Sequence, residues 1–505
     1  MLISRHTGRL ILTIIIASYV LLGALYAMRT PKWQTPDEPA HFNYIRHLAE
    51  QGSFPVLSVG DYPHQYLEDI KAARFPPHMS IAALNYESHQ PPLYYVLGAM
   101  LYKATVGLGF DRQFLLLRLF SVVLGAAELW VIYCLVREAL PTGLEAARAS
   151  IDAEVLALAA TALVAVLPMH IAMTAAINND TLAELILLLM LLQAARAVEK
   201  RMDRQRALVM GLLWGLALLT KTTVYATVFG ILVATTLLTT LPRQQALRYI
   251  TLTVVVGLIM ATPWFMRNAL VYGDLDILVW KRHDMVVEGQ LRTSDLLHEL
   301  GPVFLLERFA VTTFRSFWAQ FGWMGVVVDQ RIYQALALLC LLLAAGLVQF
   351  VLRLWRGLIQ LSPSLKRVLV LLLLSTGLTV LTYLGYNLKF VQHQGRYLFP
   401  ALGPLAVASA LSLQELLQRR MARLLGAILL STALLSLIWG ASTGRPHEWT
   451  ALLVGGSGAL LLFLALLPAG WRWVVLTVPY AALLLLNPLL IEAFIVPALM
   501  AAQAE

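Results

Sequence analysis

Long apolar runs, repeated along the whole chain, constrain this sequence more than any other feature. A helix needs about 20 mostly apolar residues to cross a bilayer, and only helices or closed barrels satisfy every backbone polar group in lipid. Runs of helical length lie near residues 10–28, 113–137, 154–172, 181–198, 207–220, 222–241, 249–266, 331–352, 367–386, 398–417, 424–441, 448–468 and 471–491. The sequence therefore predicts an all-α, polytopic membrane protein with about 13 transmembrane helices.

The composition agrees with a chain that lies mostly in lipid. Of its 505 residues, 59% are hydrophobic and 13% are charged, whereas a soluble domain is typically about 45–50% apolar and about 25% charged. An ordinary soluble enzyme and a disordered chain are both excluded. The two cysteines, Cys134 and Cys340, lie inside apolar runs, which argues against a disulfide framework and against a cysteine metal site.

The net charge of +9 has a topological explanation, and we expect no nucleic-acid partner. Cytoplasmic loops of membrane proteins collect lysine and arginine. If residues 91–108 form an interfacial helix on the outer surface and not a span, the later basic clusters all fall inside. These clusters lie near residues 196–206, 243–248, 353–367 and 419–423. The chain is thus expected in the cytoplasmic (inner) membrane, with its N-terminus inside.

Two long mixed segments, residues 30–112 and 267–330, then lie together on the outer, periplasmic side, and any chemistry is expected there. We predict a transmembrane catalytic module over residues 1–400, which carries both outer loops. Residues 401–505 are predicted to add C-terminal transmembrane helices and no separate soluble domain.

An acidic pair, Asp37 and Glu38, follows closely after the first span. One interpretation is a pair of acids that caps a helix, since Pro36 and two acids favour a helix start. The other is a carboxylate at the membrane surface that acts as a general base, with its basicity raised by burial.

Three cations on the predicted outer side are candidates for binding a phosphate. Lys221 either snorkels at a helix end or contacts an anion. Arg396 lies in an outer connection where basic residues are scarce, and arginine grips phosphate oxygens in a bidentate fashion. Arg267 follows Trp264 and is equally suited to anchoring at the interface. We place Arg396 ahead of the other two.

Polar residues near these charges allow two readings each. Asp180 is either an N-cap, or an orienting acid or sugar contact. His41, His89 and His393 could gather around a metal with Asp37, but no spacing is specific for a metal. A divalent metal is therefore possible, and no cofactor is required.

An acid also lies within a predicted span. Glu128 is expected either to pair with Arg118 or Lys103, or to be satisfied structurally by its packing. The second outer segment contains three tryptophans: Trp280, Trp318 and Trp323. We expect them at the interface between membrane and water. The alternative is that they stack on a sugar.

Several short motifs, taken in order, resemble the GT-C superfamily of membrane glycosyltransferases. The resemblance is closest to the aminoarabinose transferase and protein O-mannosyltransferase branches. It extends best over residues 30–270, although Gln90 replaces a lysine found in the aminoarabinose transferase. The motifs are QTPDE at 34–38, YIR at 44–46, QPPLYY at 90–95, INND at 177–180, GLALLTK at 215–221 and GRYLFP at 395–400.

This resemblance implies an enzyme that takes a sugar from a polyprenyl-phosphate donor and passes it to a glycan, lipid or protein acceptor outside the cytoplasm. Asp37 matches the carboxylate thought to activate the acceptor hydroxyl, and we include Glu38 as catalytic. Arg396, Lys221 and Arg267 are expected to bind the donor phosphate. The expected substrate-binding residues are His41, Tyr44, His89, Gln90, Tyr94, Asp180 and Tyr397.

Direct displacement with one general base and no covalent nucleophile predicts inversion at the anomeric carbon. The alternative function is a membrane transporter or a flippase for lipid-linked sugars, which the many spans and the intramembrane charges would also suit. The two long outer segments and the absence of a sequence repeat favour the enzyme.

Overall fold

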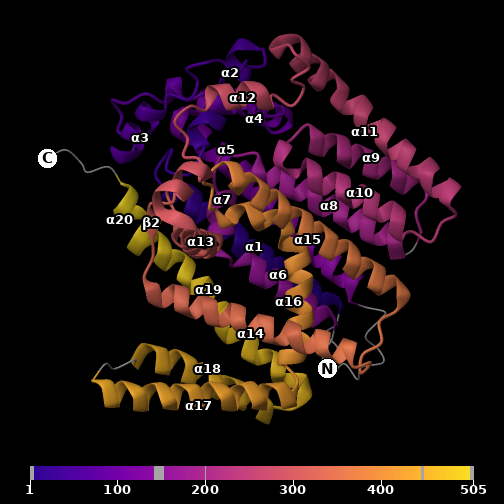
Figure 1. Cartoon of the computed structure of the whole chain (residues 1–505), viewed down its shortest axis with the longest axis vertical. Coiled ribbons are helices and arrows are strands. Elements are labelled where there is room, and N and C mark those ends of the chain that lie inside the picture. The colour runs from indigo at the N-terminus through magenta and orange to yellow at the C-terminus, as the bar shows by residue number, and fades with distance from the viewer. Residues whose placement is uncertain (1–4, 141–152, 200, 445–447, 501–505) are drawn as a thin grey trace.

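The computed structural model describes residues 5–140, 153–199, 201–444 and 448–500, and these are almost entirely helical (Figure 1). Ten helical stretches among them are long and apolar enough to cross a membrane. They are α1 (Arg5–Arg29), α5 (Phe110–Ala139), α8 (Asp180–Glu199), α11 (Arg243–Tyr272), α14 (Gln330–Trp355), α15 (Pro363–Lys389), η6 (Gly395–Ala401) with α16 (Leu402–Leu416), α17 (Arg419–Thr443), α18 (Glu448–Leu466), and the run of η7 (Ala469–Leu476), α19 (Thr477–Leu490), η8 (Ile491–Ile495) and α20 (Val496–Leu499). The predicted all-α, polytopic membrane fold is confirmed.

The count of about 13 spans is not confirmed, although each predicted run overlaps a helix. Two runs form only α9 (Arg204–Leu218, 15 residues) and α10 (Tyr225–Leu238, 14 residues), and a span needs about 20 residues. A third run folds as α6 (Ala153–Ala165) and α7 (Pro168–Thr174), which are bent by 65° and make an eleventh span only if taken together.

Proline accounts for the bend between α6 and α7. Proline starts a helix readily, but it disfavours a helical conformation in the residue before it. Leu167 is accordingly extended, with φ −73° and ψ 109°, and Pro168 opens α7. The bend leaves His170 fully buried among the helices.

Short helices from the two long segments gather at one end of the bundle, at the top of Figure 1. One of them, α4 (Leu93–Ala104), has 12 residues and is too short to span a bilayer, as predicted for residues 91–108. Its first residue, Leu93, donates its amide to the Leu219 carbonyl at 2.8 Å. These helices are α2 (Glu38–Gln51), α3 (His64–Ala72), α4 (Leu93–Ala104) and α12 (Trp280–Val286).

The second long segment continues into α13 (Thr293–Trp318), which is kinked where Gly301 has φ 77°. A tight hairpin follows, in which β1 (Gln320–Phe321) pairs antiparallel with β2 (Val326–Val327). Short 3₁₀ turns complete the connections at Ile81–Ala83, Tyr86–His89, Val106–Leu108 and Thr222–Val224.

The interior is formed by α5, α8 and the η6–α16 stretch. In these helices 56–78% of the most apolar window is buried, against 17% in α17 and 28% in α18. The α17–α18 pair lies at the bottom edge of Figure 1, whereas α19 runs back beside α1. There the Tyr26 hydroxyl donates to Asn487 Oδ1 at 3.1 Å. The division at residue 400 stays a prediction.

Candidate active site

Asp37 stands where α2 begins, in an uncommon backbone conformation. Its φ of 68° is left-handed, and its side chain makes no capping hydrogen bond to α2. Its Oδ2 instead accepts from Arg396 Nη2 at 2.8 Å, and its Oδ1 accepts from the Tyr86 hydroxyl at 3.1 Å. The capping interpretation of Asp37 is therefore wrong: a strained residue presents its carboxylate to a buried cation.

Arg396 is held by a close contact between η6 and α13. A Cβ at Gly395 would collide with the Thr313 carbonyl oxygen and the Phe317 backbone, so only glycine fits there. The Gly395 amide donates to Ser316 Oγ at 2.7 Å. Arg396 is 6% exposed, and its Nε has no hydrogen-bond partner. A buried guanidinium with an unused donor is suited to receive an anion.

A second ion pair joins the start of α8 to the turn before α10. Lys221 Nζ lies 2.6 Å from Asp180 Oδ1 and donates to Asn179 Oδ1 at 3.1 Å. Asn178 Oδ1, and not Asp180, accepts the first amides of α8. Two sequence interpretations are thereby corrected. Asp180 is not the capping side chain, and Lys221 is buried and paired instead of snorkelling.

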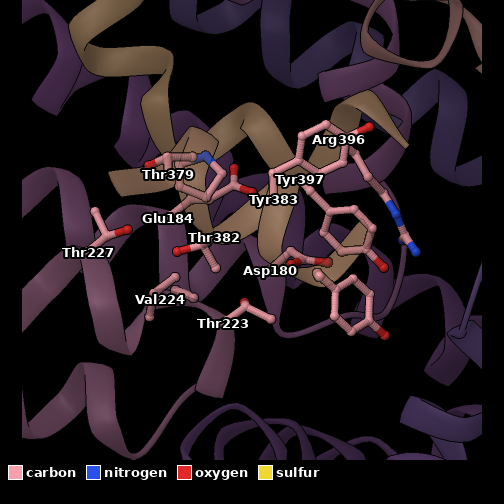
Figure 2. Close-up of a pocket in the computed structure, with 13 residues that line it drawn as sticks. Asp180, Glu184, Thr223, Val224, Thr227, Thr379, Thr382, Tyr383, Arg396 and Tyr397 are labelled. Atoms are coloured by element: carbon pink, nitrogen blue, oxygen red, sulfur yellow. The ribbon is translucent and has the colours of Figure 1, made fainter. Parts of the chain in front are cut away.

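Two cavities meet at Arg396. The outer cavity has a volume of about 290 Å³ and is lined by Asp37, Tyr86, Glu87 and His283 among others. The inner cavity, of about 40 Å³, lies among α8, α10, α15 and η6 (Figure 2). Its lining includes Asp180 and Glu184, together with several threonines and tyrosines. The residues that line both cavities are Tyr386, Arg396 and Tyr397.

Neighbouring charges and burial shift the pKa of Asp37 in opposite directions. Burial is the strongest influence on its pKa and would raise it, but Arg396, His41 and Lys221 together bring the pKa below the ordinary 3.8. Burial lowers the pKa of His41, which favours its neutral form. It raises the pKa of Glu87, whose Oε2 has no partner. Asp37 is thus an ionised carboxylate whose state depends on its cation.

Glu38 lies beside Asp37 in sequence but faces another partner. It is fully buried, and both of its oxygens bond Arg118, at 2.8 and 2.7 Å. Arg118 also donates to the carbonyls of Ala27, Thr30 and Pro31. The pair therefore fastens the end of α1 to α5 and the start of α2, and Glu38 lines neither cavity.

Arg267 also lies outside the lining of both cavities. It donates to the Phe54 and Pro55 carbonyls at 3.3 and 2.7 Å. Its guanidinium lies 5.0 Å from the centre of the Trp264 ring. These contacts match the predicted interfacial anchor, and they join α11 to the first long segment.

Of the seven predicted substrate-binding residues, Asp180 and Tyr397 line a cavity. The other five pack among α2, α4 and their neighbours. Tyr44 stacks on Tyr95 with ring centres 3.7 Å apart, and His41 Nδ1 lies 2.8 Å from the Tyr95 hydroxyl. Burial lowers the pKa of His89 to about 4. Gln90 Oε1 accepts a hydrogen bond from Asn179 Nδ2, and the Tyr94 hydroxyl shares a hydrogen bond with Ser121 Oγ.

Sequence reasoning missed Tyr86, Glu87 and Tyr386, all of which line the outer cavity. Tyr86 and Glu87 lie only four and three positions before the motif at residues 90–95. An aromatic residue followed by an acid, so close to a motif, was an available signal. Tyr386 lies within an apolar span and stands out only because α15 ends at the cavity.

The histidines considered with Asp37 do not gather around one point. The His89 ring lies beside the His283 ring at a tilt of 55°, with ring centres 4.6 Å apart, and the His393 ring meets the Phe309 ring edge to face. Among the described residues, the one group with metal-ligand spacing is Glu128, His170 and Glu184. Glu128 therefore pairs with a histidine and not with Arg118 or Lys103, which corrects its predicted partner.

We compared the chain with protein families and with solved structures. Residues 89–266 match the family model described as dolichyl-phosphate-mannose-protein mannosyltransferase. No protein with a curated description matches the chain. ArnT from Cupriavidus metallidurans bound to undecaprenyl phosphate aligns with a TM-score of 0.50 and 15% identity, over 96% of this chain and 76% of that one.

Other solved structures align less well. Apo ArnT from the same organism gives a TM-score of 0.49 at 16% identity, over 96% of this chain and 78% of that one. An oligosaccharyltransferase from Archaeoglobus fulgidus tethered to an acceptor peptide gives 0.44 at 12% identity, over 95% and 55%. The family match over residues 89–266 and the ArnT-like fold confirm the predicted resemblance to the GT-C superfamily.

Proposed function

We propose that this multi-pass membrane protein transfers a sugar from a polyprenyl-phosphate donor to an acceptor hydroxyl at the outer face of the cytoplasmic membrane. The observation that carries the proposal is the Asp37–Arg396 pair at the meeting of two cavities. A base and an anion-binding cation side by side are what a displacement at a sugar phosphate requires.

Arg396 is the proposed phosphate ligand. Its guanidinium is always charged and carries an unpartnered, buried Nε, so it can bind a second anion without leaving Asp37 altogether. Lys221 itself lines neither cavity, but it is paired with Asp180 of the inner cavity and adds a second positive charge behind that residue. Positive charges fixed where the leaving phosphate gains negative charge stabilise the transition state.

Asp37 is the proposed general base. While it is paired with Arg396, its pKa is low and it is a weak base. When the donor phosphate engages Arg396, the opposing charge is shared, and burial then acts to raise the pKa of Asp37. The carboxylate becomes a stronger base once the donor is bound. It removes the acceptor proton as the hydroxyl oxygen attacks the anomeric carbon and the phosphate leaves, with inversion.

The outer cavity is the proposed acceptor site. It contains the Asp37 carboxylate and the rings of Tyr86 and Trp323, together with Glu87 and Lys71. Aromatic faces and charged hydrogen-bonding groups suit a sugar or another polar acceptor better than an acyl chain. Glu38 holds the start of α2 in place through Arg118, and it does not take part in the reaction. Arg267 anchors the first long segment, and it does not bind the phosphate.

The decisive assay uses purified protein in detergent with a labelled polyprenyl-monophosphate sugar. We expect release of polyprenyl phosphate and transfer of label to acceptors from an envelope extract. A transporter or flippase needs a sealed membrane and would leave the donor intact in detergent, which would refute the proposal. A requirement for a lipid pyrophosphate donor would refute the proposed donor class.

A further inference from the structure

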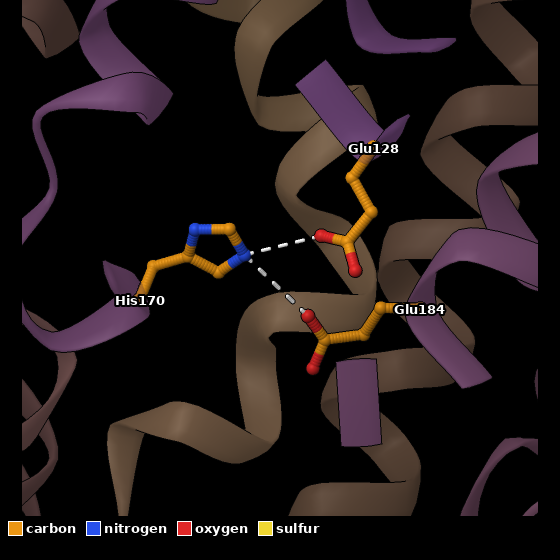
Figure 3. A group of neighbouring side chains, drawn as sticks. All are labelled: Glu128, His170 and Glu184. Atoms are coloured by element: carbon orange, nitrogen blue, oxygen red, sulfur yellow. Dashed lines mark hydrogen bonds and ion pairs between the residues drawn. The ribbon is translucent and has the colours of Figure 1, made fainter. Parts of the chain in front are cut away.

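Three ionisable side chains meet in the interior, apart from the Asp37–Arg396 pair. Glu128 on α5, His170 on α7 and Glu184 on α8 converge on one point (Figure 3). His170 Nε2 lies 3.1 Å from Glu128 Oε2 and 3.7 Å from Glu184 Oε2. All three residues are buried, with exposures of 0%, 0% and 5%.

Within the part of the chain that the structure describes, the two carboxylates of this cluster share one histidine as their ion-pair partner. Among the residues with described side chains, no lysine or arginine forms an ion pair with Glu128 or Glu184. Glu128 Oε1 has no hydrogen-bond partner, and Figure 3 shows this oxygen turned toward Glu184. The aromatic rings of Tyr19 and Phe399 pack against His170, with their centres 5.9 and 5.4 Å from the centre of the imidazole ring. Two carboxylates buried among helices at membrane depth are costly without a cation.

The spacing of the donor atoms fits a small divalent ion. Zinc binds imidazole nitrogen and carboxylate oxygen at about 2.0–2.2 Å in tetrahedral geometry, so two ligand atoms stand about 3.4 Å apart. The observed separations of 3.1 and 3.7 Å lie on either side of that value. One imidazole and two carboxylates suit zinc, iron or manganese better than calcium or magnesium, which prefer oxygen ligands alone.

We propose that Glu128, His170 and Glu184 bind one divalent transition-metal ion, of which zinc is the best fit, and that the ion ties α5, α7 and α8 together. Three protein ligands leave a fourth position for water. Glu184 also lines the inner cavity (Figure 2), so the proposed site borders that cavity.

The proposed ion has a structural consequence for the neighbouring site. Glu184 lies one helical turn after Asp180 on α8, and α7 is the short helix set at 65° to α6. Fixing both helices to α5 holds the start of α8, and with it the Asp180–Lys221 pair, in place. The ion is therefore a positioning element, and its presence does not depend on the proposed transfer reaction.

Metal content tests the inference directly. Full-length protein is purified in detergent, loaded with zinc, freed of excess ion by gel filtration and measured by elemental analysis. We expect about one zinc per chain and at least a tenfold loss of retained zinc in Glu128→Gln and Glu184→Gln. The control is His298→Gln, since His298 is exposed on α13 and should leave retention unchanged. Zinc-free protein, or equal retention in all variants, would overturn the proposal.

A measurement on the unaltered chain covers the case in which the variants do not fold. A chelator should lower the midpoint of thermal unfolding of the wild-type protein, and added zinc should restore it. If the cluster holds protons and not an ion, neither treatment shifts the midpoint, and the proposal fails.

Discussion

At the scale of single residues, the site is defined by which cation each acid contacts. Asp37 and Glu38 are adjacent in sequence and have separate roles: Asp37 faces Arg396 in the outer cavity, and Glu38 is enclosed with Arg118. A left-handed φ at Asp37 separates the two carboxylates. The acidic pair could be identified from sequence. The division of labour within it could not, because it depends on side chains some 80 and 360 positions further along the chain.

Replacing Arg396 by lysine tests the phosphate ligand. Lysine keeps the charge but loses the planar fork and the unpartnered Nε, so we expect at least a tenfold rise in the KM for the donor. Arg267→Lys is the matched control, because Arg267 lines neither cavity, and its donor KM should stay within about twofold of wild type. Equal effects of the two changes would remove Arg396 from its proposed role.

The lowered pKa of Asp37 predicts a pH dependence of stability. A carboxyl group whose pKa is lower in the folded state than in the unfolded one adds stability above its unfolded value. That stability is lost as the pH falls through the folded value. Here the loss should begin near the ordinary pKa of 3.8 and continue below it. The difference in unfolding midpoint between wild type and Asp37→Asn should therefore shrink as the pH falls from 5 to 3. A constant difference would contradict the assigned pair.

At the scale of elements, close contacts between helices fix the site. The η6 turn approaches α13 so closely that Gly395 can carry no side chain, and Arg396 follows at once. The Arg118–Glu38 pair joins α5 to the start of α2. Apolar periodicity located the helices well. It gave no sign that α6 and α7 are bent by 65°, because hydropathy does not report the direction of a helix axis. The run at 207–220 was already shorter than a span, as α9 proves to be, whereas the run at 222–241 gave no sign that α10 has only 14 residues.

Gly395→Ala should disturb Arg396 through the backbone. The added methyl group meets the Thr313 carbonyl and the Phe317 amide, so η6 must shift. We expect transfer activity to fall by roughly tenfold or more, since small displacements of a catalytic group are costly. Gly385→Ala in α15 is the control, because nothing lies within 4 Å of its added Cβ. If both variants are fully active, the contact does not position Arg396.

Breaking the buried Arg118–Glu38 pair should cost stability. Removing one partner of such a pair leaves an uncompensated buried charge, at a cost of about 3–5 kcal/mol. Arg118→Met should therefore unfold at markedly lower denaturant concentration than wild type. The comparison is Arg46→Met, which removes a half-buried arginine of α2 that has no ion pair among the described residues and donates one hydrogen bond, to Asn43 Oδ1. Similar unfolding of the two variants would argue against the anchoring role.

At the scale of the whole molecule, the chain places its short helices together at one end and its long apolar helices below them (Figure 1). The sequence was sufficient to predict the all-α membrane fold, a helix within residues 91–108 that is too short to span a bilayer, and the resemblance to GT-C enzymes. The cluster of Glu128, His170 and Glu184 was not predicted as a group. Its members come from three helices, and nothing in their spacing joins them.

The proposed orientation can be checked with single cysteines in a chain whose Cys134 and Cys340 are replaced by alanine. Ser58 is exposed in the first long loop, and Arg420 is exposed at the start of α17. The two variants are Ser58→Cys and Arg420→Cys. In intact cells, a maleimide that cannot cross the membrane should label position 58 and spare position 420 until the cells are permeabilised. The reverse pattern would invert the proposed topology.

The most direct test of the central claim is the single-turnover rate of transfer by Asp37→Asn with saturating donor. Asparagine keeps the shape of the side chain but cannot accept the acceptor proton, so the rate should fall by about 10²–10⁴-fold while donor binding persists. The same amide change at exposed Asp69 in the same loop should leave the rate unchanged. A rate for Asp37→Asn equal to that of Asp69→Asn would contradict the assignment of Asp37 as the base.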